Sequence, residues 1–232
     1  IQFLVFLMAV IKAVDEYADL LRISVASAGN DHRLGANEAP PAVVSIFLGD
    51  ELTEVLKSIE NDTYFTSHGA VQMDIGATVL PHFVKDNTDR NRTSPFAFTG
   101  NKFEFRMLGS AASVANPNIV LNTAVAEALD QFAKELDGVA PEDMEHAVHE
   151  LIKRAIKKHK RVIFNGNGYT DEWIEEAEKR GLYNLKSTPD ALPMWIAQKN
   201  IDLFTKHSIF TSEELHSRYE IWLENYSKTI NI

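Results

Sequence analysis

A succession of helical patterns in the second half of the chain constrains its fold most strongly. Asn116 as N-cap, Pro117 at the first helical position and Gly138 as the stop predict a long first helix. Apolar spacing predicts further helices at residues 141–160, 170–180, 189–206 and 211–226. The last begins with Thr211 and Glu214 at capping-box spacing. This half is therefore predicted to be mainly helical.

The first half combines shorter elements with turn-rich loops. Its apolar N-terminal segment predicts a buried helix running to about Arg22. Residues 24–42 are rich in Gly, Asn, Ala and Pro and predict an ordered loop. A strand is predicted at residues 43–48 and a helix at residues 49–60.

Residues 102–108 alternate strictly between polar and apolar side chains, which is typical of a half-buried strand. The period of two places Lys102, Glu104 and Arg106 on one face and turns Phe103, Phe105 and Met107 into the core. Alternating charges usually face solvent. From this pattern alone, a solvated face and a cleft that grips anions both stay open.

The N-terminal residues 1–11 form an apolar run that could be mistaken for a membrane segment. A spanning helix needs roughly 20 apolar residues, and Lys12 interrupts this run earlier. Because a helix of this kind needs partners on several faces, we expect the chain to be a piece of a longer protein.

Length and composition allow a sizeable core and limit the partners. The 232 residues, 45% of them apolar, suit a globular chain. We predict an α+β fold, with antiparallel strands and helices in residues 1–138 and a mainly α-helical region in residues 139–232. A net charge of -10 disfavours binding to nucleic acid or anionic membranes. The absence of cysteine excludes disulfides and thiolate metal sites, and fits a cytoplasmic location.

Three short blocks between Asn30 and Arg106 carry the groups that could hold two anions together and transfer phosphate. They are Asn-Asp-His-Arg-Leu-Gly-Ala-Asn-Glu-Ala-Pro-Pro at residues 30–41, Asn-Arg-Thr at residues 91–93 and Lys-Phe-Glu-Phe-Arg at residues 102–106. Their order and spacing resemble the substrate half of a glutamine synthetase active site. The Ala-Asn-Pro run at residues 115–117 resembles the start of the helix that follows in that family. The sequence of residues 96–104 resembles the family's large type III branch.

The resemblance implies roles for four basic residues. Arg33 and Arg106 would grip the carboxylates of glutamate, which suits the planar guanidinium group. Arg92 would face the transferring phosphoryl group and, with Lys102, the phosphates of the nucleotide. Lys102 stands where many relatives have arginine, so it would act as a point charge without bidentate geometry.

The resemblance also assigns two carboxylates. Glu104 matches a ligand of Mg²⁺ or Mn²⁺, and Glu38 matches the acid of a flexible loop that binds ammonium and takes its proton. One position departs from the pattern: relatives outside the type III branch have a further arginine where this chain has Ala97.

The implied reaction is the ATP-dependent ligation of ammonia to L-glutamate, which gives L-glutamine through a γ-glutamyl phosphate intermediate. The implied partners are glutamate, ammonium, ATP and further copies of the chain in a ring-type homo-oligomer, a dodecamer. The family's other metal ligands precede the Arg33 block, so we expect this chain to carry part of the active site and to be inactive alone. A non-catalytic assembly or regulatory module, or a related ligase that joins glutamate to a larger amine, stays open as an alternative.

Four other features could hold ligands, but a structural role explains each one better. They are the basic run at residues 153–161, the pair His146 and His149, the Asn-Gly-Asn-Gly segment at residues 165–168, and the tryptophans Trp173, Trp195 and Trp222. We interpret them as a solvated helix end, surface histidines, a turn, and core or subunit-contact side chains, respectively.

Overall fold

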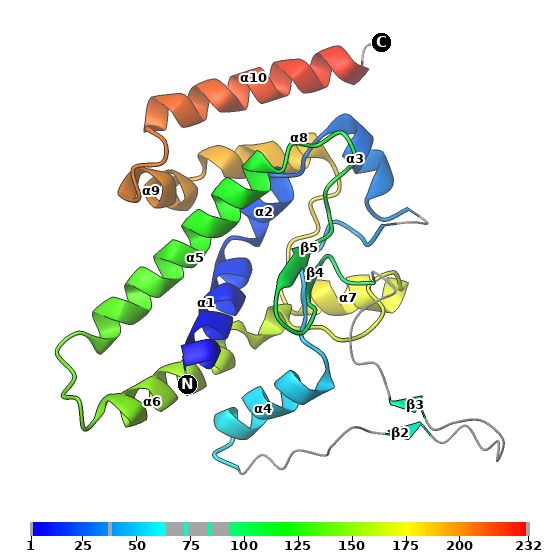
Figure 1. Cartoon of the computed structure of the whole chain (residues 1–232). Coiled ribbons are helices and arrows are strands. Elements are labelled where there is room, and N and C mark those ends of the chain that lie inside the picture. The colour runs from blue at the N-terminus through cyan, green and yellow to red at the C-terminus, as the bar shows by residue number, and fades with distance from the viewer. Residues whose placement is uncertain (1, 37–38, 64–71, 74–82, 85–92, 231–232) are drawn as a thin grey trace.

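The computed structural model describes residues 2–36, 39–63, 72–73, 83–84 and 93–230 (Figure 1). Its helices are α1 (Gln2–Glu16), α2 (Ala18–Ile23), α3 (Ala28–Arg33), α4 (Asp50–Glu60), α5 (Ala115–Leu136), α6 (Met144–His159), α7 (Asp171–Lys179), α8 (Thr188–Ala191), α9 (Gln198–Lys206) and α10 (Ser212–Ile230), with the 3₁₀ helices η1 (Lys160–Val162) and η2 (Leu192–Ile196). Its strands are β1 (Ile46–Phe47), β2 (Gln72–Met73), β3 (Phe83–Val84), β4 (Phe96–Phe98) and β5 (Phe103–Phe105). The described chain is thus mostly helical with little sheet, which fits the α+β class in broad terms.

The larger sheet has three strands in the order β1-β4-β5 and is mixed. β4 and β5 are antiparallel, as expected, whereas β1 runs parallel to β4. The strands are also shorter than the predicted ones at residues 43–48 and 102–108. A hydrogen-bond ladder extends only as far as its partner strand, and β4 is three residues long. A separate two-stranded sheet pairs β2 with β3 in antiparallel fashion.

The N-terminal helix is divided in two, where the sequence predicts one helix running to about Arg22. Tyr17 has φ −122° and ψ 28°, outside the helical range, and separates α1 from α2. Figure 1 shows α1 running beside α5, and the two helices contact each other over much of their length. The predicted loop at residues 24–42 also contains a helix, α3, which begins after the N-cap residue Ser27.

One apolar core joins the two parts of the chain. Its fully buried members include Leu7, Leu21, Ile46, Phe96, Val120, Ile152, Trp195, Phe204 and Leu215. These residues lie on both sides of the boundary expected near residue 138, which stays a prediction. In the described part of the chain, no helix has both the length and the apolar content to cross a membrane.

The predicted helices of the second half match α5, α6, α7 and α10 to within a few residues. α5 begins two positions early, because Val114 and not Asn116 occupies the N-cap position, and Gly138 with φ 77° follows its end as predicted. The helix predicted at residues 189–206 is instead α8, η2 and α9 in succession. Pro193 accounts for this break, because proline lacks the N–H that a continuous helix needs.

Replacing Thr211 by alanine should cost about 1 kcal/mol of stability, because Thr211 caps α10. Its Oγ1 accepts from the Glu214 backbone N–H (3.2 Å), and Glu214 Oε2 accepts from the Thr211 backbone N–H (2.8 Å), which confirms the predicted capping box. Denaturant unfolding measures the loss. Thr229→Ala, at the other end of α10, is the control; an equal loss in both variants would contradict the capping role.

Candidate active site

The charged face of β5 presents a carboxylate between two cations. Glu104 Oε1 lies 3.2 Å from Lys102 Nζ, and Glu104 Oε2 lies 3.0 Å from an Arg106 terminal nitrogen. Arg106 Nε also donates to Glu104 Oε2 (3.2 Å). The side chains of Lys102, Glu104 and Arg106 are 65%, 38% and 13% exposed, so the guanidinium is the shielded member and the ammonium the accessible one.

Phenylalanine rings cover the opposite face of the same strands. Phe103 stacks on Phe96 with ring centroids 5.0 Å apart, and Phe105 meets Phe96 edge-on at 5.9 Å. The predicted alternation across β5 is therefore confirmed. Apolar contacts on this face fix the strand, and so the charged side chains must point the other way.

The two cations keep Glu104 ionised. Hydrogen bonds from Arg106 first, and from Lys102 second, hold the pKa of the Glu104 carboxyl below its usual value. An ionised carboxylate is what a hard cation requires, but one carboxylate does not make a metal site. Among the described residues, no group of three or more His, Cys, Asp or Glu side chains could hold a metal ion.

Arg33 ends α3 and is tied to the segment that follows β5. Its Nε donates to Asn30 Oδ1 (3.0 Å), and a terminal nitrogen donates to the Leu108 carbonyl (2.8 Å). Leu108 is two residues beyond Arg106, which limits the separation of their Cα atoms to about 7 Å. A guanidinium has five N–H groups, so after these two bonds Arg33 can still donate to a carboxylate.

A cavity of about 360 Å³ lies beside Arg33. Its lining includes Asn30, Gly109, Asn116 and, from α10, Trp222. The indole N–H of Trp222 donates to the Ala26 carbonyl (3.2 Å), across 196 positions of sequence. The C-terminal helix thereby contributes a wall to the cavity that contains Arg33.

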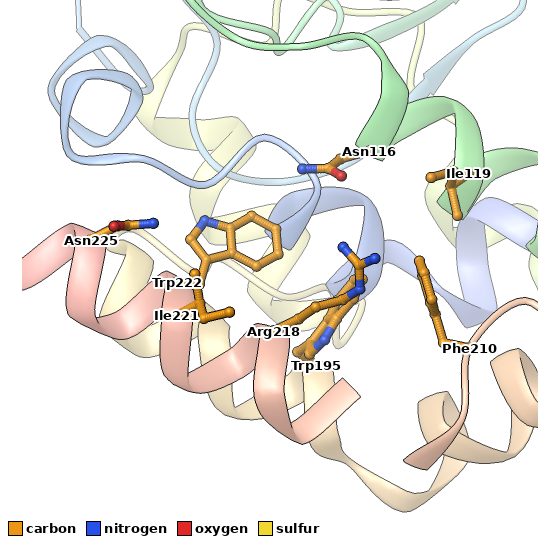
Figure 2. A pocket seen from close by; sticks show the side chains of 8 residues that line it. All are labelled: Asn116, Ile119, Trp195, Phe210, Arg218, Ile221, Trp222 and Asn225. Carbon is orange, nitrogen blue, oxygen red and sulfur yellow. The ribbon is translucent and has the colours of Figure 1, made fainter. Parts of the chain in front are cut away.

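A second, more open groove of about 260 Å³ continues on the other side of Trp222. Figure 2 shows Arg218 and Trp222 on α10, with Asn116 facing them from the start of α5. The Arg218 guanidinium lies over the Phe210 ring, 4.4 Å from its centroid. Asn116 and Trp222 line both the groove and the Arg33 cavity.

Two of the predicted site residues, Glu38 and Arg92, lie outside the described residues. Their described neighbours are held by backbone bonds. The Gly35 N–H donates to the Pro40 carbonyl (3.0 Å), and the Gly168 N–H donates to the Thr93 carbonyl (3.1 Å). The structure thus brings Lys102, Glu104 and Arg106 together and ties Arg33 to the same strand end, while the other two stay predictions.

The Asn-Gly-Asn-Gly segment is irregular, with a bend at Gly166 and a turn at Gly168, and it contacts the loop that follows β1 and the start of α4. The Asn165 side chain accepts from the backbone N–H groups of Leu48 (3.0 Å) and Gly49 (3.2 Å) and donates to Thr53 (2.8 Å). Its last residue, Gly168, approaches Thr93 so closely that a Cβ there would lie 2.3 Å from the Thr93 carbonyl oxygen. Only glycine permits this approach without a shift of the backbone.

The substitution Gly168→Ala should therefore destabilise the protein by roughly 1–3 kcal/mol, the usual cost of overpacking. Denaturant unfolding measures it. The control is Gly29→Ala in α3, where an added Cβ meets nothing within 4 Å, and which should be neutral or stabilising because alanine favours helix. A Gly168→Ala protein as stable as the parent would contradict this prediction, because it would show that the backbone at Thr93 can move away from the added Cβ without loss of stability.

The remaining candidates have structural roles. The basic run at residues 153–161 is largely exposed, as the predicted solvated helix end should be, and Lys153 is its shielded member. Each cation in the following list pairs with a carboxylate: Lys153, Arg154, Lys158, Lys160 and Arg161. His149 lies 3.6 Å from an oxygen of Asp62. Trp173 and Trp195 are buried core residues, as interpreted, and Trp173 stacks on Phe164 at 3.8 Å.

Sequence reasoning missed three contributors to the site: Asn30, Gly168 and Trp222. Asn30 lies three positions before Arg33 on the same helix, so helical spacing could have suggested their contact. Gly168 ends a run of alternating asparagine and glycine, which indicates a turn but not its partner. No local sequence pattern indicates that Trp222 lines the cavity, because its hydrogen-bond partner, Ala26, is 196 positions away in sequence.

Comparisons with known proteins agree with the motifs. A family model described as the glutamine synthetase C-terminal domain matches residues 147–232. A glutamine synthetase from Butyrivibrio fibrisolvens is 57% identical over 100% of this chain and 33% of its own length. A type-3 glutamine synthetase from Dictyostelium discoideum is 52% identical over 100% of this chain and 32% of its own length. A glutamine synthetase from Bacteroides fragilis is 41% identical over 99% of this chain and 32% of its own length. The chain spans about a third of the length of the curated relatives that it matches.

Proposed function

This chain belongs to the glutamine synthetase family, and from that premise we propose that the full-length protein, one as long as these relatives, ligates ammonia to L-glutamate. ATP supplies the energy. The chain contributes part of the active site and should be inactive alone, since it spans about a third of the relatives' length.

The arrangement of Lys102, Glu104 and Arg106 supports the proposal most directly. The charged face of β5 presents two cations and one carboxylate, and the segment after β5 is bonded to the helix that ends with Arg33. The cations can offset the charge of two anionic substrates, and the carboxylate can bind a cation. A solvated sheet face would not require the shielding of Arg106 or its bond to Glu104. The roles proposed below are those that the resemblance to glutamine synthetases implies.

In the first step, glutamate and ATP react. The γ-carboxylate attacks the γ-phosphorus of ATP, the bond from that phosphorus to the bridging oxygen breaks, and ADP leaves. Arg33 and Arg106 hold the carboxylates of glutamate, while Arg92 and Lys102 face the phosphates and offset their charge. The exposed ammonium of Lys102 can reach outward to a nucleotide.

In the second step, ammonium must lose a proton before it can attack. Glu38 accepts that proton, and ammonia attacks the γ-carbonyl of glutamyl phosphate. The bond from that carbon to the phosphate oxygen breaks, the nitrogen gives a second proton to the departing phosphate, and glutamine and inorganic phosphate result. Glu38 belongs to the segment bracketed by the bond between Gly35 and Pro40.

The cofactor and the assembly belong to the same proposal. Glu104 would supply one ligand to Mg²⁺ or Mn²⁺, with the other ligands from outside the described residues. We propose that the protein forms a ring-type homo-oligomer, a dodecamer, and works in the cytoplasm. We propose that neither nucleic acid nor a membrane is among its partners, which is consistent with the net charge of -10.

The test is phosphate release and glutamine formation by the full-length protein and by this chain, with ATP, glutamate and magnesium, each with and without ammonium. We expect ammonium-dependent turnover by the full-length protein alone. Turnover by the short chain would contradict the half-site proposal. If neither protein turned over but both assembled, the non-catalytic module would replace the enzyme; faster turnover with a larger amine than with ammonium would indicate a related ligase.

A further inference from the structure

The buried side chain of Asn30 links the two arginines that are proposed to bind glutamate. Asn30 is 3% exposed. Its Nδ2 donates to the carbonyls of Val25 (2.7 Å) and Met107 (2.9 Å), and its Oδ1 accepts from Arg33 Nε (3.0 Å). We infer that Asn30 is a positioning residue for glutamate, which sets the Arg33 guanidinium relative to Arg106; this inference rests on the proposed function.

The three bonds of Asn30 reach three different segments. Val25 precedes α3, Arg33 ends α3, and Met107 directly follows Arg106 beyond the end of β5. One amide group therefore joins the helix that carries the first arginine to the segment after β5 that carries the second. A carboxylate held by both guanidinium groups is sensitive to their separation, because bidentate contacts demand fixed geometry.

Each end of this link is anchored independently. The Arg33 terminal nitrogen donates to the Leu108 carbonyl (2.8 Å), so the helix meets the same segment at two neighbouring residues. On the strand side, the Arg106 backbone N–H donates to the Pro95 carbonyl (2.8 Å), beside the first residue of β4. Asn30 is therefore connected through short backbone segments to the sheet as well as to the helix.

The chemistry of this position selects asparagine. Two carbonyl oxygens need donors and a guanidinium N–H needs an acceptor, and a planar amide supplies two donors and an acceptor from one short side chain. Aspartate has no donor when ionised, and its charge would draw the Arg33 guanidinium into an ion pair at the expense of the substrate. Alanine leaves both carbonyls and the guanidinium without these bonds.

The experiment measures steady-state kinetics of the full-length protein and its Asn30→Ala and Asn30→Asp variants, with glutamate and ATP varied separately. Both variants should raise the KM for glutamate by roughly 10- to 100-fold, since displacement of about 1 Å can have effects of this size. The KM for ATP should be little changed, because none of the three Asn30 bonds is to Lys102. Using two variants keeps the test open if one of them folds poorly.

Asn200 provides a matched control for lost folding stability. It is 0% exposed, and its Nδ2 donates to the Met194 carbonyl (2.6 Å) and to Asp19 Oδ2 (3.1 Å), far from the arginine pair in sequence. Asn200→Ala should destabilise the protein yet leave the KM for glutamate near that of the parent.

The outcomes separate the inference from the proposed function. A selective rise in the KM for glutamate in the Asn30 variants alone would support the positioning role. An active parent with unchanged glutamate KM in both variants, or the same rise in Asn200→Ala, would overturn the inference while the proposed function stands. A full-length parent that makes no glutamine would overturn the proposed function, and the inference with it.

Discussion

Replacing Asp31 by alanine is expected to lower the free energy of unfolding by about 3–5 kcal/mol, because it leaves the buried charge of Arg22 without its carboxylate partner. Asp31 Oδ1 accepts from a terminal nitrogen of Arg22 (2.8 Å), whose side chain is 1% exposed. The same carboxylate accepts from the backbone N–H (2.6 Å) and hydroxyl (3.0 Å) of Thr188 in α8. Without Asp31, the hydrogen-bond partners left to the Arg22 guanidinium among the described residues would be the carbonyls of Leu185 and Lys186.

Denaturant unfolding, followed by tryptophan fluorescence, would measure this loss. With an m-value of about 2–3 kcal/mol/M in urea, the midpoint should fall by roughly 1–2 M. Glu224→Ala is the matched control: Glu224 and Lys228 form an ion pair with 63% and 67% exposed side chains, and such surface pairs contribute about 0–1 kcal/mol. Equal losses in the two variants would show that burial does not govern the Asp31 contact.

The local patterns of the sequence predicted much of the helical fold. α5, α6, α7 and α10 follow from apolar spacing, and the α10 cap follows from two residues three positions apart. The break at Tyr17 was missed because no proline or glycine marks it. The η2 segment was missed because the apolar pattern continues through Pro193, although proline was visible in the sequence.

The site was predictable where it depends on one strand and less so where it depends on distant partners. The period of two predicted the shared face of Lys102, Glu104 and Arg106, since alternation is a local property of strands. The wall formed by Trp222 depends on a contact across 196 positions. Periodicity carries no information about which elements meet, so such contacts need the folded structure.

Ala97 shows how the structure refines a departure noted in the sequence. Ala97 pairs with Glu104 across β4 and β5 and is 0% exposed. Directly opposite residues share a face, so the arginine that the resemblance gives to relatives outside the type III branch would lie beside Glu104, at a position that is buried in this chain. The cations beside Glu104 on this face are then Lys102 and Arg106, and under the proposed function Lys102 would carry a larger share of the phosphate binding.

Replacing Glu38 by alanine in the full-length protein is expected to have the largest effect on activity. Removing a general base typically costs about 10²–10⁴-fold in rate, because ammonium that keeps its proton has no lone pair for attack. Glutamine formation at saturating ATP, glutamate and ammonium would measure the loss. ATP binding should be nearly unchanged, since the proposed nucleotide contacts are Arg92 and Lys102.

Two further variants separate proton transfer from simple loss of contact. Glu38→Gln keeps the size of the side chain but cannot accept a proton, so it should be impaired nearly as much as Glu38→Ala. Glu213→Ala, at the exposed start of α10, should retain full activity as the matched control. Unaltered glutamine formation in Glu38→Ala would reject the assignment of Glu38. Full activity in Glu38→Gln beside an impaired Glu38→Ala would instead mean that this side chain binds ammonium without taking its proton.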